Sequence, residues 1–154
     1  DAPVLVVRGR ASGPYAHMVV ATDLSDCSRA ALLTAAGLFP DAAITLVHAF
    51  HVPYEGWLKS EGVKQEVRAE AWEGLDGFLG HADMASLSGR IKALAEEGET
   101  GSVILGQLKS TGAGLLVLGT HGRSGFSHAT IGSQAEALLA AADVDVLMVR
   151  EHKA

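Results

Sequence analysis

Short apolar runs alternate with helical patterns along most of the chain, and this alternation constrains the fold more than any other feature. Each run is long enough for one buried strand, and helix signals follow it, as where Ser25 can cap the helix after the first run. Such repeated alternation predicts an α/β fold, in which helices cover both faces of a parallel sheet. The predicted strands are residues 18–22, 44–49, 90–95, 115–118 and 144–149, and the predicted helices are 28–38, 60–80, 102–112 and 133–142.

Size and charge narrow the class of partner. The 154 residues suit one domain with one core, and 48% of them are apolar. The formal charge of −6, without a run of Lys or Arg, disfavours binding to nucleic acid or to a membrane surface. A nucleotide site is still compatible with this charge, because a few backbone N–H groups can hold a phosphate.

The single cysteine and the absence of long apolar runs bear on the compartment. Cys27 alone excludes an internal disulfide, which fits a reducing cytoplasm. No apolar run approaches the roughly 20 residues of a membrane span, and no secretory signal is visible. We therefore expect a cytoplasmic protein.

The two ends of the chain resemble one another. Residues 1–8 (DAPVLVVR) and 143–150 (DVDVLMVR) agree at five of eight positions, at an offset of 142. One interpretation is that residues 4–7 are the last strand of an upstream copy of the domain; the other is a coincidence between two apolar strands. We divide the chain into an N-terminal strand and linker, 1–13, and a domain, 14–154. A lone edge strand needs a partner, so residues 4–7 should pair with a last strand, in this chain or in a neighbour.

A glycine pattern carries the strongest functional signal. Gly119-Thr120-His121-Gly122 follows the fourth predicted strand, and Gly132-Ser133 comes nine residues later, where a helix is predicted to start. Ser133 and Glu136 have the spacing of a capping box. Helix starts favour phosphate, and glycine lets the backbone approach a ligand closely. The pattern is neither a P-loop nor G-x-G-x-x-G, so spacing alone leaves open a glycine-rich turn without a ligand.

A second turn belongs to the same region if the strand order is 3-2-1-4-5. Asp23 follows the first predicted strand, and Gly119 follows the fourth. In that order the two turns flank the point where the winding direction reverses, which is where open α/β sheets bind ligands.

Three segments together resemble the universal stress protein family. They are V-V-A-T-D-L-S at 19–25, G-x2-G-x9-G-S at 119–133 and D-V-L-M-V-R at 145–150, so the resemblance spans residues 16–150. It implies a five-stranded parallel sheet of the Rossmann-like, adenine nucleotide alpha hydrolase-like class, usually dimeric through the last strands. Members with the full glycine pattern generally bind ATP, so the resemblance implies an adenine nucleotide (ATP, ADP or AMP), with or without Mg²⁺.

The resemblance also assigns roles to residues. It implies that Ala21 and Asp23 lie against adenine and ribose, and that the backbone of Ala49 contacts the base. On the phosphate side it implies two groups, Gly119 with Gly122 along ribose and phosphate, and Gly132, Ser133 and Gln134 at the helix start.

Two positions depart from the family pattern. Ala21 stands where proline is common, and Ala135 stands where a hydroxyl residue often helps to hold phosphate. The second departure would weaken triphosphate binding or favour a shorter nucleotide. Arg123 is the nearest cation to the loop, and is either a phosphate contact or a solvated side chain.

Other chemistries are less well supported. His48, His51, His121 and His128 invite a metal interpretation, but no H-E-x-x-H or Cys/His cluster occurs, so we expect no metal site. We expect His48 near a strand end, His121 near the nucleotide, and Cys27 as a buried or half-buried thiol. Residues 51–59 are a lid, a partner contact or a packed loop.

Three functions remain open. The first is a nucleotide-binding regulatory domain of a stress response. The second is an interaction module with a vestigial site, acting through its last strand as a homodimer or a tandem pair. The third is a slow ATP hydrolase or autophosphorylating protein; no G-x-S-x-G elbow is present, and we assign no catalytic residue.

Overall fold

The computed structural model describes residues 2–52, 61–121 and 131–151. Most of the segment 51–59, interpreted above as a lid, a partner contact or a packed loop, lies outside these ranges. So do Gly122 and Arg123, two of the predicted site residues, and His128.

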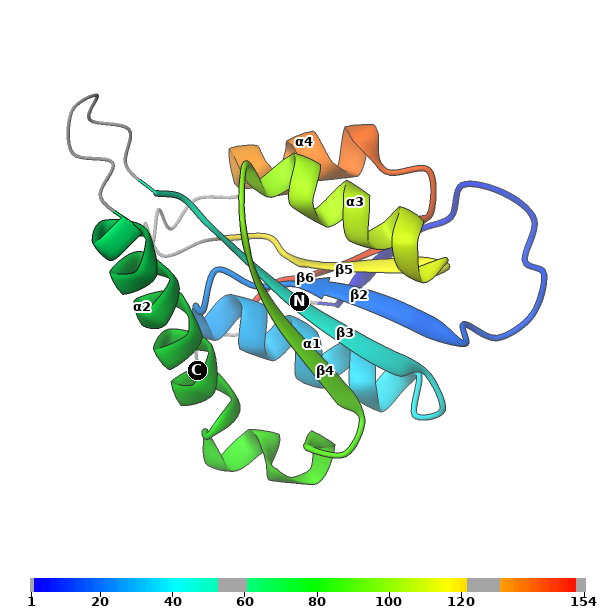
Figure 1. Ribbon diagram of the computed structural model, residues 1–154. Helices are drawn as coiled ribbons and strands as arrows, with labels where there is room; N and C mark the ends of the chain where they lie inside the picture. The colour runs from blue at the N-terminus through cyan, green and yellow to red at the C-terminus, as the bar shows by residue number, and fades with distance from the viewer. Residues whose placement is uncertain (1, 53–60, 122–130, 152–154) are drawn as a thin grey trace.

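In the described residues, six strands form one sheet in the order β1-β6-β5-β2-β3-β4 (Figure 1). Neighbours among β2 to β6 are parallel, whereas β1 is antiparallel to β6. The order β4-β3-β2-β5-β6 is the predicted 3-2-1-4-5 order, so the fold class is confirmed, and the extra N-terminal strand pairs with the last strand of its own chain. The strands are β1 (Val4–Val6), β2 (His17–Ala21), β3 (Ala43–Phe50), β4 (Ile91–Glu97), β5 (Leu115–Gly119) and β6 (Asp145–Val149).

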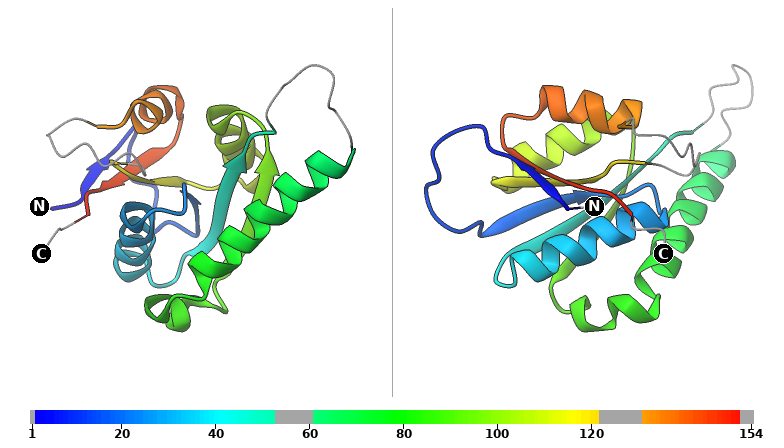
Figure 2. Two further views of the ribbon diagram at one scale, coloured as in Figure 1. Left: turned by 90° about the vertical axis from the view of Figure 1, so that its left-hand side faces the viewer. Right: turned by 180° about the vertical axis from the view of Figure 1, so that it is seen from behind.

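Helices cover both faces of the sheet, as the views in Figure 2 show. Alternate residues of a strand face opposite layers: Met18 and Val20 pack in the cluster that includes α1 and α2, and Val19 packs in the cluster that includes α3 and α4. All three residues are fully buried, which explains the continuous apolar run. The helices are α1 (Asp26–Leu38), α2 (Glu61–Leu79), α3 (Thr100–Thr111) and α4 (Ser133–Ala141), with a short 3₁₀ helix, η1 (Ala82–Leu87), that was not predicted.

Among the described residues, side chains cap the α-helices α1 and α3. Ser25 caps α1 as predicted, and its hydroxyl accepts from the backbone N–H of Ser28 at 3.2 Å. Glu99 caps α3, and its carboxylate accepts from the N–H groups of Gly101 and Ser102 at 2.9 and 2.8 Å. These backbone hydrogen bonds hold the pKa of the Glu99 carboxyl below its usual value. The helix α3 therefore starts two residues earlier than predicted.

The predicted capping box of α4 is wrong. The N-cap is Gly132, with φ −60° and ψ 148°, and its carbonyl oxygen accepts from the N–H of Glu136 at 2.9 Å. Ser133 is therefore already the first helical residue, so its hydroxyl cannot act as the cap. Glycine at the N-cap supplies no side-chain hydrogen bond to the first turn.

Candidate functional site

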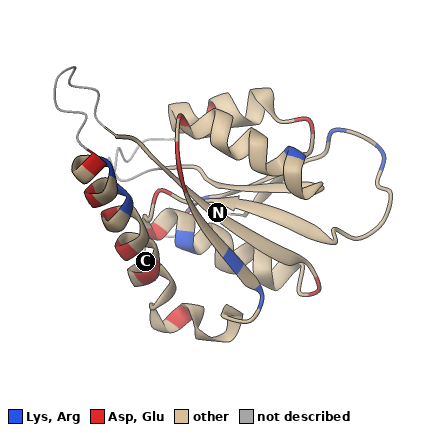
Figure 3. Ribbon diagram, in the orientation of Figure 1, with Lys and Arg blue, Asp and Glu red and all other residues tan. Residues whose placement is uncertain are grey.

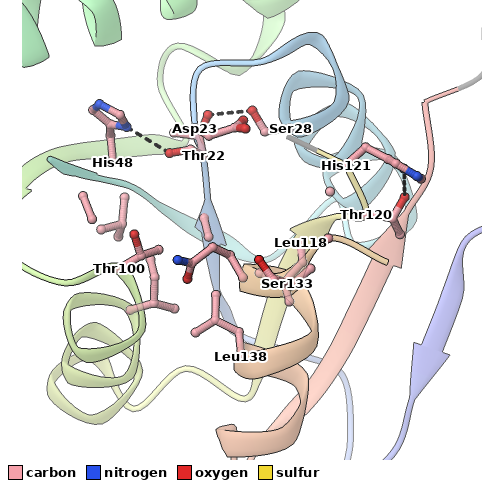
Figure 4. Close-up of a pocket in the computed structure, with 18 residues that line it drawn as sticks. Thr22, Asp23, Ser28, His48, Thr100, Leu118, Thr120, His121, Ser133 and Leu138 are labelled. Atoms are coloured by element: carbon pink, nitrogen blue, oxygen red, sulfur yellow. Dashed lines mark hydrogen bonds between the residues drawn. The ribbon is translucent and has the colours of Figure 1, made fainter. Parts of the chain in front are cut away.

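A cavity of about 290 Å³ lies at the carboxyl ends of β2, β3 and β5, bounded on the other side by α3 and α4 (Figure 4). After β2 the chain turns to α1 on one face of the sheet, and after β5 it leads to α4 on the other face, so the cavity lies at the switch point. Its lining residues are Ala21, Thr22, Asp23, Ser28, Val47, His48, Ala49, Thr100, Ile104, Leu118, Gly119, Thr120, His121, Gly132, Ser133, Gln134, Ala135 and Leu138.

The turn after β2 is held by its own polar groups. The carboxylate of Asp23 accepts from the N–H of Ser25 at 3.1 Å. Leu24 between them has φ 66°, a left-handed conformation that is uncommon outside glycine, and its N–H donates to the hydroxyl of Thr22 at 2.9 Å. These bonds fix the direction in which Asp23 enters the cavity.

Buried hydroxyls form the part of the cavity wall between β2 and α1. The hydroxyl oxygens of Thr22 and Ser28 are 2.7 Å apart, and the Ser28 hydroxyl also lies 2.9 Å from the carbonyl oxygen of Ser25. A carbonyl can only accept, so Ser28 donates to Ser25 and accepts from Thr22. Both hydroxyl hydrogens are thereby used within the protein, which makes this pair a structural part of the wall.

His48 is fixed at the end of β3. Its Nδ1 lies 3.0 Å from the carbonyl oxygen of Thr22 (Figure 4). Because that oxygen accepts, Nδ1 carries the hydrogen, and Nε2 of the neutral ring is left as an acceptor. The position near a strand end agrees with the sequence prediction, and the hydrogen bond ties β3 to the turn that carries Asp23.

Gly119 lines the cavity but is required by packing on its other side. A Cβ at this position would lie 3.0 Å from Sγ of Cys27 and 3.2 Å from the backbone carbon and oxygen of the same residue. Cys27 is buried, as predicted, and its thiol faces the carbonyl oxygen of Val149 at 3.7 Å. Glycine here allows α1 to approach β5. The sequence prediction explained this glycine by approach to a ligand and did not include the packing role.

The start of α4 closes the end of the cavity at which the sequence predicts phosphate contacts. The N–H of Gly132 donates to the carbonyl oxygen of Thr120 at 2.8 Å, which attaches the start of the helix to the end of β5. The next three N–H groups belong to the first turn and have no acceptor within the helix. Ser133 and Gln134 are exposed there, whereas Ala135 is buried.

His121 lies beside this helix start. Its Nδ1 is 2.8 Å from the hydroxyl of Thr120. The other ring nitrogen, Nε2, is buried and has no hydrogen-bond partner among the described residues.

Eight of the ten predicted site residues therefore line one cavity, and the other two, Gly122 and Arg123, lie outside the described residues. The residues brought together are Ala21, Asp23, Ala49, Gly119, Gly132, Ser133, Gln134 and Ala135.

Sequence reasoning missed the wall that α3 contributes. Thr100 and Ile104 line the cavity, and Leu138 of α4 adds to the apolar side. The helix α3 follows β4, an edge strand far from the switch point, so no local motif pointed to it. The available signal was the four-residue spacing of Thr100 and Ile104, which places both on one face of a helix that must cover the sheet.

The described residues support neither a metal site nor a membrane-spanning helix. Across residues 2–52, 61–121 and 131–151, no three His, Cys, Asp or Glu side chains are grouped as metal ligands would be. Within the same residues, every helix is too short or too polar to cross a membrane.

The fold and the site define a class of protein: an open, doubly wound α/β domain with a small-molecule-sized cavity at its switch point. The family follows from comparison. The family model described as the universal stress protein family matches residues 14–150, so the chain belongs to this family. Among curated proteins, none matches the chain.

Solved structures agree on the fold. Universal stress protein UspA from Lactobacillus plantarum is 20% identical, with a TM-score of 0.75 over 90% of this chain and 100% of its own. A universal stress protein in complex with cAMP is 22% identical, with a TM-score of 0.59 over 92% of this chain and 100% of its own. A putative universal stress protein from Pseudomonas aeruginosa is 23% identical, with a TM-score of 0.65 over 96% of this chain but only 52% of its own.

Proposed function

We propose that this domain binds an adenine nucleotide, ATP in the first place, and acts as a regulatory domain of a cytoplasmic stress response. The observation that carries the proposal is the cavity at the switch point, which ends on a helix start without a side-chain cap. A family relative has been solved with cAMP, a ligand with the same base, sugar and phosphate chemistry.

The chemistry of the lining suits the two ends of a nucleotide. Val47, Ile104 and Leu138 offer an apolar surface for a base. Asp23 supplies carboxylate oxygens, which accept from ribose hydroxyls in many nucleotide sites. The first turn of α4 supplies N–H donors and the positive end of the helix dipole for phosphate.

The volume indicates how the ligand divides between cavity and solvent. At about 290 Å³, the cavity is at the small end of the roughly 300–1,000 Å³ of small-molecule sites. We therefore propose that base and sugar fill it, while the phosphates extend along the exposed residues Ser133 and Gln134.

Charge makes Mg²⁺ part of the proposal for ATP. Among the described residues that line the cavity there is no Lys or Arg, and Ala135 offers no hydroxyl. Backbone N–H groups and a helix dipole offset about half an elementary charge. A triphosphate therefore needs a cation, whereas AMP or a cyclic monophosphate needs less compensation.

Calorimetric titration of the 154-residue chain tests the proposal, with ATP–Mg²⁺, ADP, AMP and cAMP as separate ligands. We expect saturable binding of at least one adenine nucleotide and its loss in Gly132→Val. This substitution suits the purpose because φ at Gly132 is negative and a Cβ would meet its nearest atom, the Thr120 carbonyl oxygen, at 3.4 Å. The variant should keep its fold while side-chain bulk enters the phosphate end. A folded chain that binds none of the four ligands would overturn the proposal.

The second candidate is an interaction module with a vestigial site. It is favoured by a specific observation: the last strand, β6, accepts an antiparallel strand along its outer edge. We propose that the domain pairs with a partner at this end of the sheet, where β1 covers β6, either in a homodimer or in a tandem protein. Binding and pairing are compatible, and only the absence of nucleotide binding would leave pairing as the whole function.

A further inference from the structure

The turn after β2 contains an uncommon backbone conformation. Among the described residues, Leu24 is the only one other than glycine with a positive φ, at 66°. In this left-handed region the Cβ of an L-residue is crowded by the backbone. Asn and Asp can offset that cost with a local side-chain hydrogen bond, but a leucine side chain cannot. Contacts elsewhere in the fold must therefore hold Leu24 in this conformation.

The side chain of Leu24 meets a glycine of α2. A Cβ built at Gly74 would lie 2.8 Å from Cδ1 of Leu24, well inside the roughly 3.5–4.0 Å at which carbon atoms pack. Leu24 also packs against the buried cluster that includes α1 and α2, so its side chain is part of that apolar layer. The absence of a side chain at Gly74 thus leaves the space that Leu24 fills.

The position of Gly74 on α2 supports this role. The acidic residues of α2 are all exposed (Figure 3), whereas Ala71 and Leu75 on either side of Gly74 are buried. Glycine inside a helix is destabilising relative to alanine. At Gly77, about one turn further on, a Cβ would meet nothing within 4 Å. The contact with Leu24 therefore distinguishes Gly74 from its neighbour.

The residues on both sides of this turn are fixed by other elements. The N–H of Thr22 continues the pairing of β2 with β3, and Ser25 is the N-cap of α1. Asp23 and Leu24 lie between these two fixed points, so the conformation of Leu24 constrains where the Asp23 carboxylate can lie. Figure 4 shows Asp23 with Thr22 at the edge of the cavity.

We infer that Leu24 and Gly74 are positioning residues for the proposed nucleotide site. Leu24, seated on Gly74, keeps the turn in its left-handed conformation and thereby keeps the carboxylate of Asp23 at the cavity. The helix α2 contributes none of the described residues that line the cavity, and it acts on the ligand through this contact. The inference rests on the proposed function, in which Asp23 contacts the ribose, but the geometry of the turn can be measured without a ligand.

Hydrogen exchange of single amides tests the geometry in the ligand-free chain. The N–H of Leu24 donates to the hydroxyl of Thr22, and the N–H of Ser25 donates to the carboxylate of Asp23, so both amides report on the turn. In Gly74→Ala the added Cβ displaces Leu24, and we expect both amides to exchange about 2- to 10-fold faster, the worth of one such bond. Amides of the central strand β2 open with the whole fold and measure stability separately.

Two further variants separate this contact from a general effect of alanine in α2. Gly77→Ala is the matched control and should leave both amides unchanged, because its Cβ has free space. Leu24→Gly removes the side chain that Gly74→Ala displaces, so adding Gly74→Ala to Leu24→Gly should not change the Ser25 amide further. Unchanged exchange in Gly74→Ala alone would show that the leucine side chain moves aside without the backbone, and would overturn the inference.

Nucleotide selectivity tests whether the turn serves the ribose. Each variant is titrated with ATP–Mg²⁺ and with 2′,3′-dideoxy-ATP–Mg²⁺, which lacks the hydroxyls from which Asp23 is proposed to accept. We expect the parent and Gly77→Ala to prefer ATP about 10-fold or more, and Gly74→Ala to lose most of this preference. A general loosening of the fold would weaken both ligands equally and leave the ratio of their affinities unchanged.

The outcomes separate the inference from the proposed function. A parent chain that binds neither ligand removes ATP from the proposed function, and the exchange measurement then decides the positioning role alone. A parent without preference for ATP, or a Gly74→Ala variant that keeps the full preference, would overturn the inference while nucleotide binding itself stands.

Discussion

At the scale of single residues, the glycines of the loop have different roles. Gly132 has an ordinary φ and room for a Cβ, whereas Gly119 is pressed against the backbone of Cys27. The sequence predicted both from one pattern and explained both by approach to a ligand. It could not predict the contact of Gly119 with Cys27, because the two residues meet only once α1 is packed against the sheet.

Gly119→Ala should therefore destabilise the fold even without ligand. The added Cβ meets Sγ of Cys27 at 3.0 Å and its backbone at 3.2 Å, and the backbone of a buried helix cannot yield easily. Overpacking of this kind typically costs about 1–3 kcal/mol. Urea unfolding measures the change. Gly106→Ala is the matched control, since nothing lies within 4 Å of that Cβ and alanine is favoured in a helix by roughly 0.5–1 kcal/mol. Equal stability of the Gly119 variant and the parent would contradict this account.

At the scale of elements, the ends of the predicted strands and helices lie within two residues of the observed ends, because each element has a clear apolar period. Capping set two details that the period did not contain. Glu99 extends α3 backwards, and Gly132 replaces the predicted cap of α4. The caps of α3 and α4 both depend on where the preceding loop is attached to the fold. A local sequence pattern carries no information about that attachment. The same holds for Thr100, which enters the cavity because α3 starts early.

A proline at the first position of α4 tests the N–H donors of the helix start while the helix itself is kept. Ser133 is the first helical position, where proline is tolerated, and Gly132 before it is extended, as proline requires. Ser133→Pro should keep the fold while deleting one N–H group at the helix start. If phosphates bind there, nucleotide affinity should fall about 10-fold or more, the worth of a hydrogen bond to a charged group at roughly 1.5–3 kcal/mol.

Ser133→Ala is the control, because it removes the hydroxyl and keeps the N–H group. Calorimetry on both variants, with melting temperatures measured alongside, distinguishes the two groups. Unchanged affinity in the proline variant would exclude this N–H as a phosphate donor. A loss in the alanine variant as large as in the proline variant would assign the effect to the hydroxyl instead.

The clamp on β6, which Asp145 forms with Arg8 and Tyr15, should be visible in the pH dependence of stability. The hydrogen bonds from the Arg8 N–H and the Tyr15 hydroxyl hold the pKa of Asp145 below its usual value. A lowered pKa contributes stability that is present above the unfolded pKa of about 3.9 and is lost as pH falls through the folded value. Asp145→Asn should therefore flatten the acid side of the stability curve.

Tyr15 acts at the other end of the pH scale. Burial and the Asp145 carboxylate raise its pKa to about 12. The stability from its neutral form is present below the unfolded pKa of about 10 and is lost as pH rises towards 12. Each side chain shifts the pKa of the other, so both Tyr15→Phe and Asp145→Asn should weaken the acid and the alkaline dependence of stability. In Tyr15→Phe, part of the acid effect should remain, because the Arg8 N–H still donates to Asp145. Urea titrations from pH 3 to 11 on both variants measure these changes. Parallel curves for both variants and the parent would mean that the clamp does not form in solution.

At the scale of the whole molecule, the strand order followed from the alternation and the family resemblance, but the partner of the N-terminal strand did not. The repeat predicted that residues 4–7 pair with a last strand, and left open whether the pair lies within one chain. In the structure, β1 pairs with β6 of the same chain, and the register places Leu5 opposite Leu147. A register depends on long-range packing, so a repeat of eight residues could not supply it.

Removing residues 1–13 should turn β6 into a surface for self-association. The match of the family model to residues 14–150 indicates that the remaining part is a complete unit. With β1 gone, the edge of β6 is apolar and unpaired, and the register seen with β1 places Leu147 opposite Leu147 of a second molecule. Arg150 then takes the place that Arg8 holds near Asp145, because the repeat makes the two arginines equivalent. Sedimentation over a range of concentrations should show the truncated chain at about twice its monomer mass.

Asp145→Arg in the truncated chain places like charges together on both sides of the two-fold axis of such a dimer, and should restore the monomer. A truncated chain that stays monomeric at every concentration would mean that β1 does not stand in for a second last strand.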